Sequence, residues 1–157
     1  MNIINPLSYH TRDIAISHSH DPNNITVGSF AKAAEDATGI AVVIDVFRAF
    51  TTAAIALANG AARILMVDDL AKALELRDQG TGHYCIGERH GIKPANFDYG
   101  NSPAELLDVR FDGKTLIQTT SNGTRGIVAA SAAKRIYAGS FVTAEATIQA
   151  IGGAPDI

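Results

Sequence analysis

Hydrophobic and polar positions follow two alternating patterns along the chain. Short apolar runs rich in β-branched residues are typical of buried strands, and such runs lie at 40–45, 63–67, 83–87, 114–120 and 135–140. The longer stretches between them are rich in alanine and predict helices over 51–59, 70–79, 123–133 and 141–153. This alternation predicts an α/β fold with a largely parallel sheet and helices on both faces.

Local signals for helix starts agree with this segmentation. Asp68 or Asp69 is expected to cap the helix over 70–79. Further along, Ser102 and Glu105 form a capping-box pattern with a proline at the first helical position. A short helix is therefore predicted to begin at this point.

The chain is long enough for one domain of ordinary size. Of its 157 residues, 46% are hydrophobic, which is enough to bury a core. A polar segment at 1–25 precedes the alternating pattern, so we expect an α/β domain at 26–157. The alternation calls for another strand after the last predicted helix. The domain either ends there naturally or is incomplete.

Charge and cysteine content narrow the class of partners. Thirteen basic and sixteen acidic side chains give a formal net charge of −3, so no basic surface for nucleic acid is expected. Cys85 is the single cysteine, which excludes an intrachain disulfide and suits a reducing compartment. Because the chain opens without a signal-peptide pattern and has no run long enough to span a bilayer, we expect a cytoplasmic protein without a membrane partner.

The first candidate for chemistry is the end of the strand at 40–45. In parallel α/β sheets, ligands gather outside the carboxyl ends of the strands. Asp45 stands at this end after a run of apolar residues, where a carboxylate is costly unless a cation pairs with it. A divalent metal would meet that need. The alternative is a structural pair of Asp45 and Arg48 that caps the following helix.

The second candidate is the end of the strand at 114–120. Hydroxyl, amide and glycine residues cluster here at a predicted helix start: Thr119, Thr120, Ser121, Asn122, Gly123 and Thr124. Unpaired backbone N–H groups and the helix dipole favour an anion at such a position. The alternative is an ordinary helix cap, but a cap needs only one polar residue.

The third candidate is the polar segment GERHGIKPANFDYGNSP at 87–103. Arg89 and Lys93 are candidate ligands for a phosphate or a sulfonate. Glu88 and Asp98 are candidates for binding Mg²⁺ or moving protons.

The same segment ends at another helix start, which carries Asn101 and Ser102. The bland alternative for the whole segment is a solvated loop whose charges have no function. Three loops of one chemical character are expected at one sheet edge, however, and this favours a site.

These three segments resemble the motifs of the 2-phosphosulfolactate phosphatase (ComB) family. The matching stretches are VVIDVFRAFTTA at 42–53, GERHGIKPANFDYGNSP at 87–103 and TTSNGTRG at 119–126, in the family's order. The resemblance covers roughly 26–157, and it implies that these residues form the N-terminal portion of the family's full domain.

The resemblance implies a three-layer α/β/α fold and a Mg²⁺-dependent acid phosphatase. Its substrate would be a small phosphorylated acid, 2-phospho-3-sulfolactate, on the route to coenzyme M. The implied catalytic residues are Asp45, Arg48, Glu88, Arg89 and Asp98. The implied metal ligands are Asp45, Glu88 and Asp98. The implied substrate-binding residues are Thr51, Thr52, Lys93, Asn101, Ser102, Thr119, Thr120, Asn122, Gly123 and Thr124.

The mechanism we expect is metal-assisted hydrolysis of a phosphomonoester. Asp45 would bind Mg²⁺, and Arg48 or Arg89 would stabilise the transferred phosphoryl group. Glu88 or Asp98 would act as a second metal ligand or as the general acid. Whether water or Asp45 is the nucleophile stays open at this point.

Two other functions are consistent with the same residues. One is a non-catalytic module that binds a phosphate or sulfonate. The other is an incomplete subunit that needs a partner chain. An unfinished sheet edge would also favour a homo-oligomer.

Overall fold

The computed structural model describes residues 26–153. The polar segment predicted at 1–25 lies outside the described residues. The strands are β1 (Ile40–Ile44), β2 (Arg63–Met66), β3 (Tyr84–Gly87), β4 (Thr115–Thr119) and β5 (Arg135–Gly139). The α-helices are α1 (Phe30–Glu35), α2 (Ala49–Ala58), α3 (Leu70–Asp78), α4 (Pro103–Leu106), α5 (Gly123–Ala129) and α6 (Ala144–Gly152). Two 3₁₀ turns complete the set, η1 (Ala130–Ala132) and η2 (Phe141–Thr143).

The described strands form two sheets, and every pairing within them is parallel. One sheet has the order β2-β4-β3 and the other consists of β1 and β5. The parallel pairing confirms the prediction from the alternating pattern. The division into two sheets was not predicted, because alternation identifies strands but does not say which strands pair.

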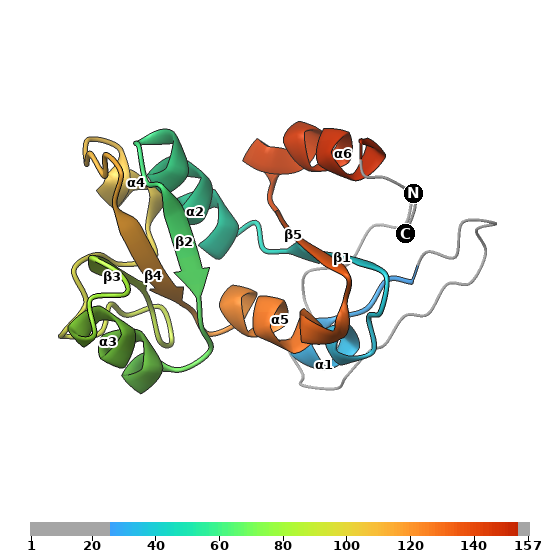
Figure 1. The fold of residues 1–157 in the computed structure, drawn as a ribbon, viewed down its shortest axis with the longest axis horizontal. Helices are drawn as coiled ribbons and strands as arrows, with labels where there is room; N and C mark the ends of the chain where they lie inside the picture. The colour runs from blue at the N-terminus through green and yellow to red at the C-terminus, as the bar shows by residue number, and fades with distance from the viewer. Residues whose placement is uncertain (1–25, 154–157) are drawn as a thin grey trace.

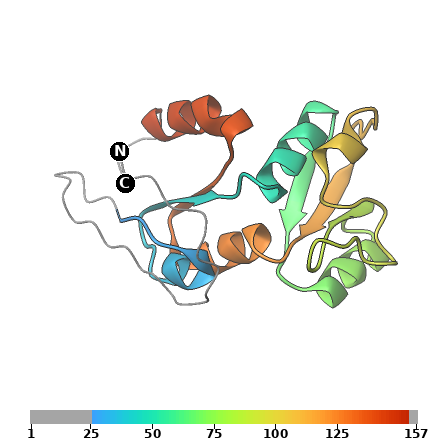
Figure 2. The same ribbon diagram turned by 180° about the vertical axis from the view of Figure 1, so that it is seen from behind.

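Helices cover both faces of each sheet, which gives the predicted three-layer α/β/α arrangement. Figure 1 shows α6 on one side of the β1–β5 sheet and α1 with α5 on the other. At the three-stranded sheet, α2 packs against α4 on one face and α3 packs on the opposite face. The reverse view in Figure 2 shows the same two groups of elements, joined by the segments that lead into α2 and α5.

The core lies on both faces of β4. Leu116 packs with Ile86 and Leu106 toward α2 and α4, whereas Ile117 packs with Cys85 toward α3. Successive residues of a strand point to opposite faces, so one apolar run serves both helical layers. This is why the strand is buried at every position.

Helix boundaries differ from the sequence prediction in a few places. Asp69 is confirmed as the cap of α3, because its carboxylate accepts a hydrogen bond from Lys72 N at 2.9 Å. The capping box predicted at Ser102 is wrong. Ser102 makes no side-chain cap hydrogen bond, and the Glu105 carboxylate instead accepts one from Gly100 N at 2.9 Å.

Other corrections concern the lengths of helices. The helix predicted over 51–59 begins two residues earlier, and the one predicted over 123–133 ends at residue 129 and continues as η1. A short helix at 30–35 was not predicted. Between residues 26 and 153, no helix combines the length and the apolar character needed to cross a membrane.

Candidate active site

A cavity of about 330 Å³ opens where the loops after β1, β3 and β4 meet. Its lining residues are Asp45, Phe47, Arg48, Glu88, His90, Gly91, Asn101, Ser121 and Asn122. The carboxyl ends of parallel strands from both sheets therefore contribute to one cavity, as expected for ligand sites in α/β folds. We call it the inter-sheet pocket.

Asp45 lies at the end of β1, between the N-termini of two helices. Its Oδ1 accepts a hydrogen bond from Ala49 N at 3.2 Å. A Cβ atom at Gly123 would lie 2.7 Å from Asp45 Oδ2, so glycine is needed for α5 to begin this close to the carboxylate. The positive ends of α2 and α5 thus meet the same anion.

Burial dominates the electrostatics of Asp45. Desolvation raises the pKa of its carboxyl group, and the negative charge of Glu88 adds to this, against the backbone hydrogen bonds from Ala49 and Gly123. The cap predicted for Asp45 is present. The ion pair with Arg48 is not, since no salt bridge joins these two residues.

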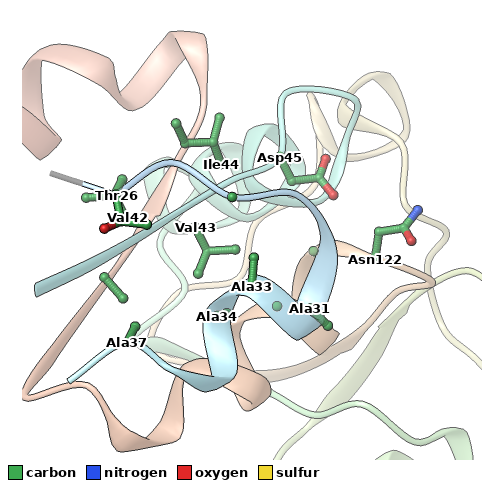
Figure 3. A pocket seen from close by; sticks show the side chains of 14 residues that line it. Thr26, Ala31, Ala33, Ala34, Ala37, Val42, Val43, Ile44, Asp45 and Asn122 are labelled. Atoms are coloured by element: carbon green, nitrogen blue, oxygen red, sulfur yellow. The ribbon is translucent and has the colours of Figure 1, made fainter. Parts of the chain in front are cut away.

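A second pocket, of about 220 Å³, lies on the other side of Asp45. It lies between α1, β1 and α5 and is lined mainly by alanine, valine and glycine residues. Figure 3 shows Asp45 and Asn122 at the same end of it. Both residues also line the inter-sheet pocket, so the two cavities adjoin at these side chains.

Glu88 joins two loops of the inter-sheet pocket. Its Oε1 accepts a hydrogen bond from Ser121 N at 2.6 Å, and its Oε2 accepts from Gly91 N at 2.7 Å and from Ser121 Oγ at 3.0 Å. Only 8% of the residue is exposed. Desolvation raises the pKa of Glu88, but these hydrogen bonds and the charge of Arg89 outweigh it, so that the pKa is lowered. Glu88 is therefore held as an anion.

The turn at 88–92 places His90 at the pocket. His90 adopts a φ of 53°, which is uncommon for a residue with a side chain. Its backbone N–H donates to Ser121 Oγ at 3.1 Å, and Arg89 and Ile92 exchange backbone hydrogen bonds around it. The imidazole is exposed and lines the inter-sheet pocket.

Arg48 is the arginine that lines the inter-sheet pocket, and no lysine lines it. The side chain is half-buried, and within residues 26–153 it takes part in no salt bridge. A guanidinium group that no carboxylate neutralises is suited to bind an anion from solution.

Asn101 is the most deeply buried uncharged polar side chain of this pocket. Only 7% of the residue is exposed, and its Oδ1 has no hydrogen-bond partner among the described residues. The segment around it is fixed, because Gly87 N donates to Tyr99 O at 3.1 Å and Gly100 N donates to Glu105. A residue of the pocket lining therefore carries an acceptor atom that no described residue satisfies.

Three predicted site residues of the 87–103 segment stabilise the segment itself. The Arg89 guanidinium donates to Asp68 O and to Thr119 Oγ1, each at 2.7 Å. The Asp98 carboxylate accepts from Cys85 N at 2.7 Å, and Lys93 Nζ lies 3.4 Å from Asp98 O. None of the three lines the inter-sheet pocket.

The predicted threonine cluster is also engaged within the protein. Thr124 N donates to Thr120 Oγ1 at 3.2 Å, and Thr120 N donates to Thr124 Oγ1 at 2.8 Å. Both residues are buried. The first backbone groups of α5 are thus met by Thr120 and Asp45, which leaves less room for the anion predicted there.

The remaining predicted residues divide between the pocket and the core. Asn122 lines the pocket, and Gly123 lies behind it against Asp45. Thr51 Oγ1 donates to Val46 O at 3.0 Å, and Thr52 is fully buried. Ser102 precedes α4 and lies outside the pocket lining.

The structure does not bring the three predicted metal ligands together. Asp45 and Glu88 line the inter-sheet pocket and Asp98 does not. Within the described part of the chain, no group of three or more histidine, cysteine, aspartate or glutamate side chains is arranged to hold a metal. A metal site in the inter-sheet pocket would therefore need oxygen ligands other than carboxylates, such as amide oxygens or water.

Comparison with known proteins adds a family to this geometry. Residues 26–156 match the model of a family described as 2-phosphosulpholactate phosphatase. The chain belongs to this family. The expectation from the three motifs is therefore confirmed.

Curated relatives of the 2-phosphosulpholactate phosphatase family share between a third and a half of their aligned residues with this chain. A probable 2-phosphosulfolactate phosphatase of Caldicellulosiruptor saccharolyticus is 43% identical over 111 residues, which are 71% of this chain and 46% of the relative. One of Thermoplasma acidophilum is 39% identical over 118 residues, 75% of this chain and 53% of the relative. One of Carboxydothermus hydrogenoformans is 45% identical over 105 residues, 67% of this chain and 43% of the relative. The chain thus spans about half the length of these relatives.

Several pocket residues of this family member were missed from its sequence. His90 was not among the predicted site residues, although its place two residues after Glu88 and directly before Gly91 could have marked it. Phe47 and Gly91 were not singled out at all. Ser121 was noted only as part of a polar run, and its role as the partner of Glu88 depends on the fold.

Proposed function

We propose that this chain carries the phosphate-binding pocket of a phosphomonoester hydrolase that acts on a small phosphorylated acid. The observation that carries the proposal is the Arg48 guanidinium, which forms no salt bridge within residues 26–153, in a cavity that Asp45 and Asn101 also line. The family match over 26–156 makes 2-phospho-3-sulfolactate the first substrate to test. A place on the route to coenzyme M follows from the family resemblance and stays a prediction.

Arg48 would bind the phosphate group. Its planar guanidinium can donate two parallel hydrogen bonds to phosphate oxygens. In the transition state the same donors would stabilise the negative charge on the transferred phosphoryl group.

Asp45 would hold Mg²⁺ at the end of β1. Its burial disfavours the charged carboxylate, no salt bridge within residues 26–153 offsets this, and a cation would remove the penalty. Carboxylate and amide oxygens are hard ligands of the kind Mg²⁺ prefers, and the inter-sheet pocket contains both. When bound, Mg²⁺ would supply positive charge next to the phosphate.

His90 would donate the proton to the leaving oxygen. A general acid must be protonated before it acts, and the Glu88 carboxyl group has a lowered pKa because its hydrogen bonds hold it as an anion. Asp98 lies outside the pocket. Among residues 26–153, His90 is the titratable side chain that lines the pocket besides Asp45, Glu88 and Arg48.

The direct test is phosphate release from 2-phospho-3-sulfolactate by the full chain, with Mg²⁺ and then with excess EDTA. We expect release that EDTA abolishes, and the Asp45→Asn variant should keep only a small residual rate while retaining its circular dichroism spectrum. A parallel assay with 2-phospholactate, which lacks the sulfonate, measures how far that group is recognised. Absence of release from both esters would contradict the hydrolase proposal.

A second candidate function, an interaction subunit, is favoured by an apolar groove of about 310 Å³ between β1 and α6. Ile44, Phe141 and Ile148 line it and are exposed. Exposed apolar surface of this kind is typical of protein contacts. A monomer at all concentrations in sedimentation equilibrium would count against self-association through this groove.

A further inference from the structure

Buried polar atoms without partners indicate where a ligand is missing from a site. Three such side-chain atoms occur among the described residues: Thr52 Oγ1, Asn101 Oδ1 and Gln118 Oε1. Thr52 and Gln118 lie in the core, away from the pocket lining. Asn101 alone of the three lines the inter-sheet pocket.

The Asn101 oxygen can only accept, so its missing partner is a hydrogen-bond donor or a cation. No donor from the described residues reaches it. Only 7% of the residue is exposed, and the preceding backbone is held by Gly87 N donating to Tyr99 O and by Gly100 N donating to the Glu105 carboxylate, so moving the side chain out to water would be costly. Because Asn101 lines the inter-sheet pocket, this pocket is the place from which such a partner would reach it.

The three carboxylates predicted as metal ligands differ in how many lone pairs their hydrogen bonds leave free for a cation. Glu88 accepts three hydrogen bonds, and using it as a ligand would compete with the contacts that join the turn at 88–92 to Ser121. Asp98 accepts from Cys85 N and from Arg77 outside the pocket. Asp45 lines the pocket and accepts hydrogen bonds from the backbone N–H groups of Ala49 and Gly123, which leaves about two of the four lone pairs of a carboxylate for a cation.

We infer that the Asn101 amide oxygen and the Asp45 carboxylate together form the divalent-cation site of the inter-sheet pocket. Glu88 is then a positioning residue that holds the turn at 88–92 against the loop after β4. A site with one carboxylate, one amide oxygen and several waters suits Mg²⁺, which keeps part of its hydration shell in proteins.

This inference deepens the proposed function and assigns ligands that differ from the carboxylate triad predicted from the sequence. It also explains the depth of Asn101, because an amide oxygen that coordinates a cation must be ordered and shielded. Because Arg48 lines the same pocket, its guanidinium and the cation would both bind the phosphate group of one substrate molecule.

The test is Mn²⁺ binding by the full chain without substrate, measured from the loss of the free-ion electron paramagnetic resonance signal and by displacement with Mg²⁺. The wild type should bind Mn²⁺. Asn101→Leu, which has a similar shape and no oxygen, should bind at least tenfold more weakly. Asn101→Asp should bind at least as tightly as the wild type, because it restores the oxygen and adds charge. Asn96→Leu is the matched control, since Asn96 is exposed and contributes only its backbone carbonyl to Arg77.

Thermal unfolding separates a ligand role from a structural one. Asn101→Leu removes an unsatisfied buried group, so its unfolding temperature without Mn²⁺ should equal or exceed that of the wild type, and only the rise on adding Mn²⁺ should disappear. Should this variant not fold, Asn101→Ala takes its place in both measurements. Unchanged Mn²⁺ affinity in the Asn101 variant, or no Mn²⁺ binding by the wild type, would overturn the inference.

The outcome is distinguishable from failure of the hydrolase proposal. Mn²⁺ binding that depends on Asn101, together with no phosphate release, would sustain the cation site and refute the activity. Phosphate release that neither EDTA nor Asn101→Leu changes would sustain the hydrolase activity and refute the cation site.

Discussion

The two sheets of the molecule are built from similar apolar runs but are buried to very different extents. In β4, Ile117 is fully buried, whereas Ile44 at the end of β1 is 71% exposed. The central strand β4 has a partner on each side and helices on both faces, while β1 pairs with β5 alone within the described residues. A β-branched run therefore identifies a strand, but neighbours decide whether it forms a core.

The same contrast continues into the inter-sheet pocket. Asp45 follows β1 and has a pKa that burial raises, while Glu88 follows β3 and has a pKa that its hydrogen bonds lower in spite of burial. Two carboxyl groups in one cavity thus have opposite tendencies to carry charge, which is typical of sites that divide roles between them.

The largest expected effect compares one isoleucine from each sheet. Ile117→Ala should lower the free energy of unfolding by about 2–5 kcal/mol, because it leaves a cavity in a closely packed core. Ile44→Ala should cost less than about 1 kcal/mol, since most of its side chain is already in water. Urea denaturation of both variants measures the difference, and equal losses would show that β1 is as well supported as β4.

Removal of the pocket guanidinium comes next. Arg48→Ala should reduce the rate of phosphate release about 100- to 1000-fold, the usual cost of losing one charge-stabilising donor. Arg125→Ala is the control, because Arg125 is exposed on α5 and lies outside the pocket lining. Steady-state kinetics in which both variants lose the same activity would remove Arg48 from the phosphate site.

Glu88→Gln should lower stability near neutral pH by about 1–3 kcal/mol, because charge-assisted hydrogen bonds between two loops are replaced by weaker ones. The folded-state pKa of Glu88 is lowered, so its contribution is complete above the unfolded-state pKa and is lost as the pH falls through the folded-state pKa. The gap between variant and wild type should therefore narrow in acid. A gap that is constant from neutral to acidic pH in denaturant titrations would contradict this assignment.

Asp45→Asn should change the free energy of unfolding less than Glu88→Gln does, and its effect should depend on pH in the opposite direction. The folded-state pKa of Asp45 is raised by burial, so its contribution to stability is present below the unfolded-state pKa and is lost as the pH rises through the folded-state pKa. At neutral pH the free energy of unfolding of the variant should equal or exceed that of the wild type. In acid, the free energy of unfolding of the wild type should rise relative to that of the variant. The same titrations measure this, and a loss of stability at neutral pH would mean that the carboxylate is mainly a helix cap.

Local features of the fold could be predicted from the sequence, and features that depend on distant residues could not. The strands were found because β-branched runs are local, and the Asp69 cap could be predicted because its partner, Lys72 N, lies only three residues away. The pairing of β1 with β5 joins segments that lie far apart in the chain, and no local pattern encodes it.

The site follows the same rule. Asp45, Arg48, Glu88 and Asn122 were predicted as candidates in loops that follow strand ends, and Asn101 was predicted at a helix start. All five line the pocket. The state of each side chain depends on partners elsewhere. Glu88 is engaged by Ser121, 33 residues away, and the Asn101 oxygen is orphaned only because the fold buries it.

The most direct test of the claim that both sheets contribute to one site is a double-mutant cycle on phosphate release. Asp45→Asn represents the end of β1, and Glu88→Gln represents the end of β3. If the two groups serve one site, the double variant should be about as slow as the slower single variant, because residues that act as a unit are not additive. Rate losses that multiply would contradict the account, since they would show that the two carboxylates act independently.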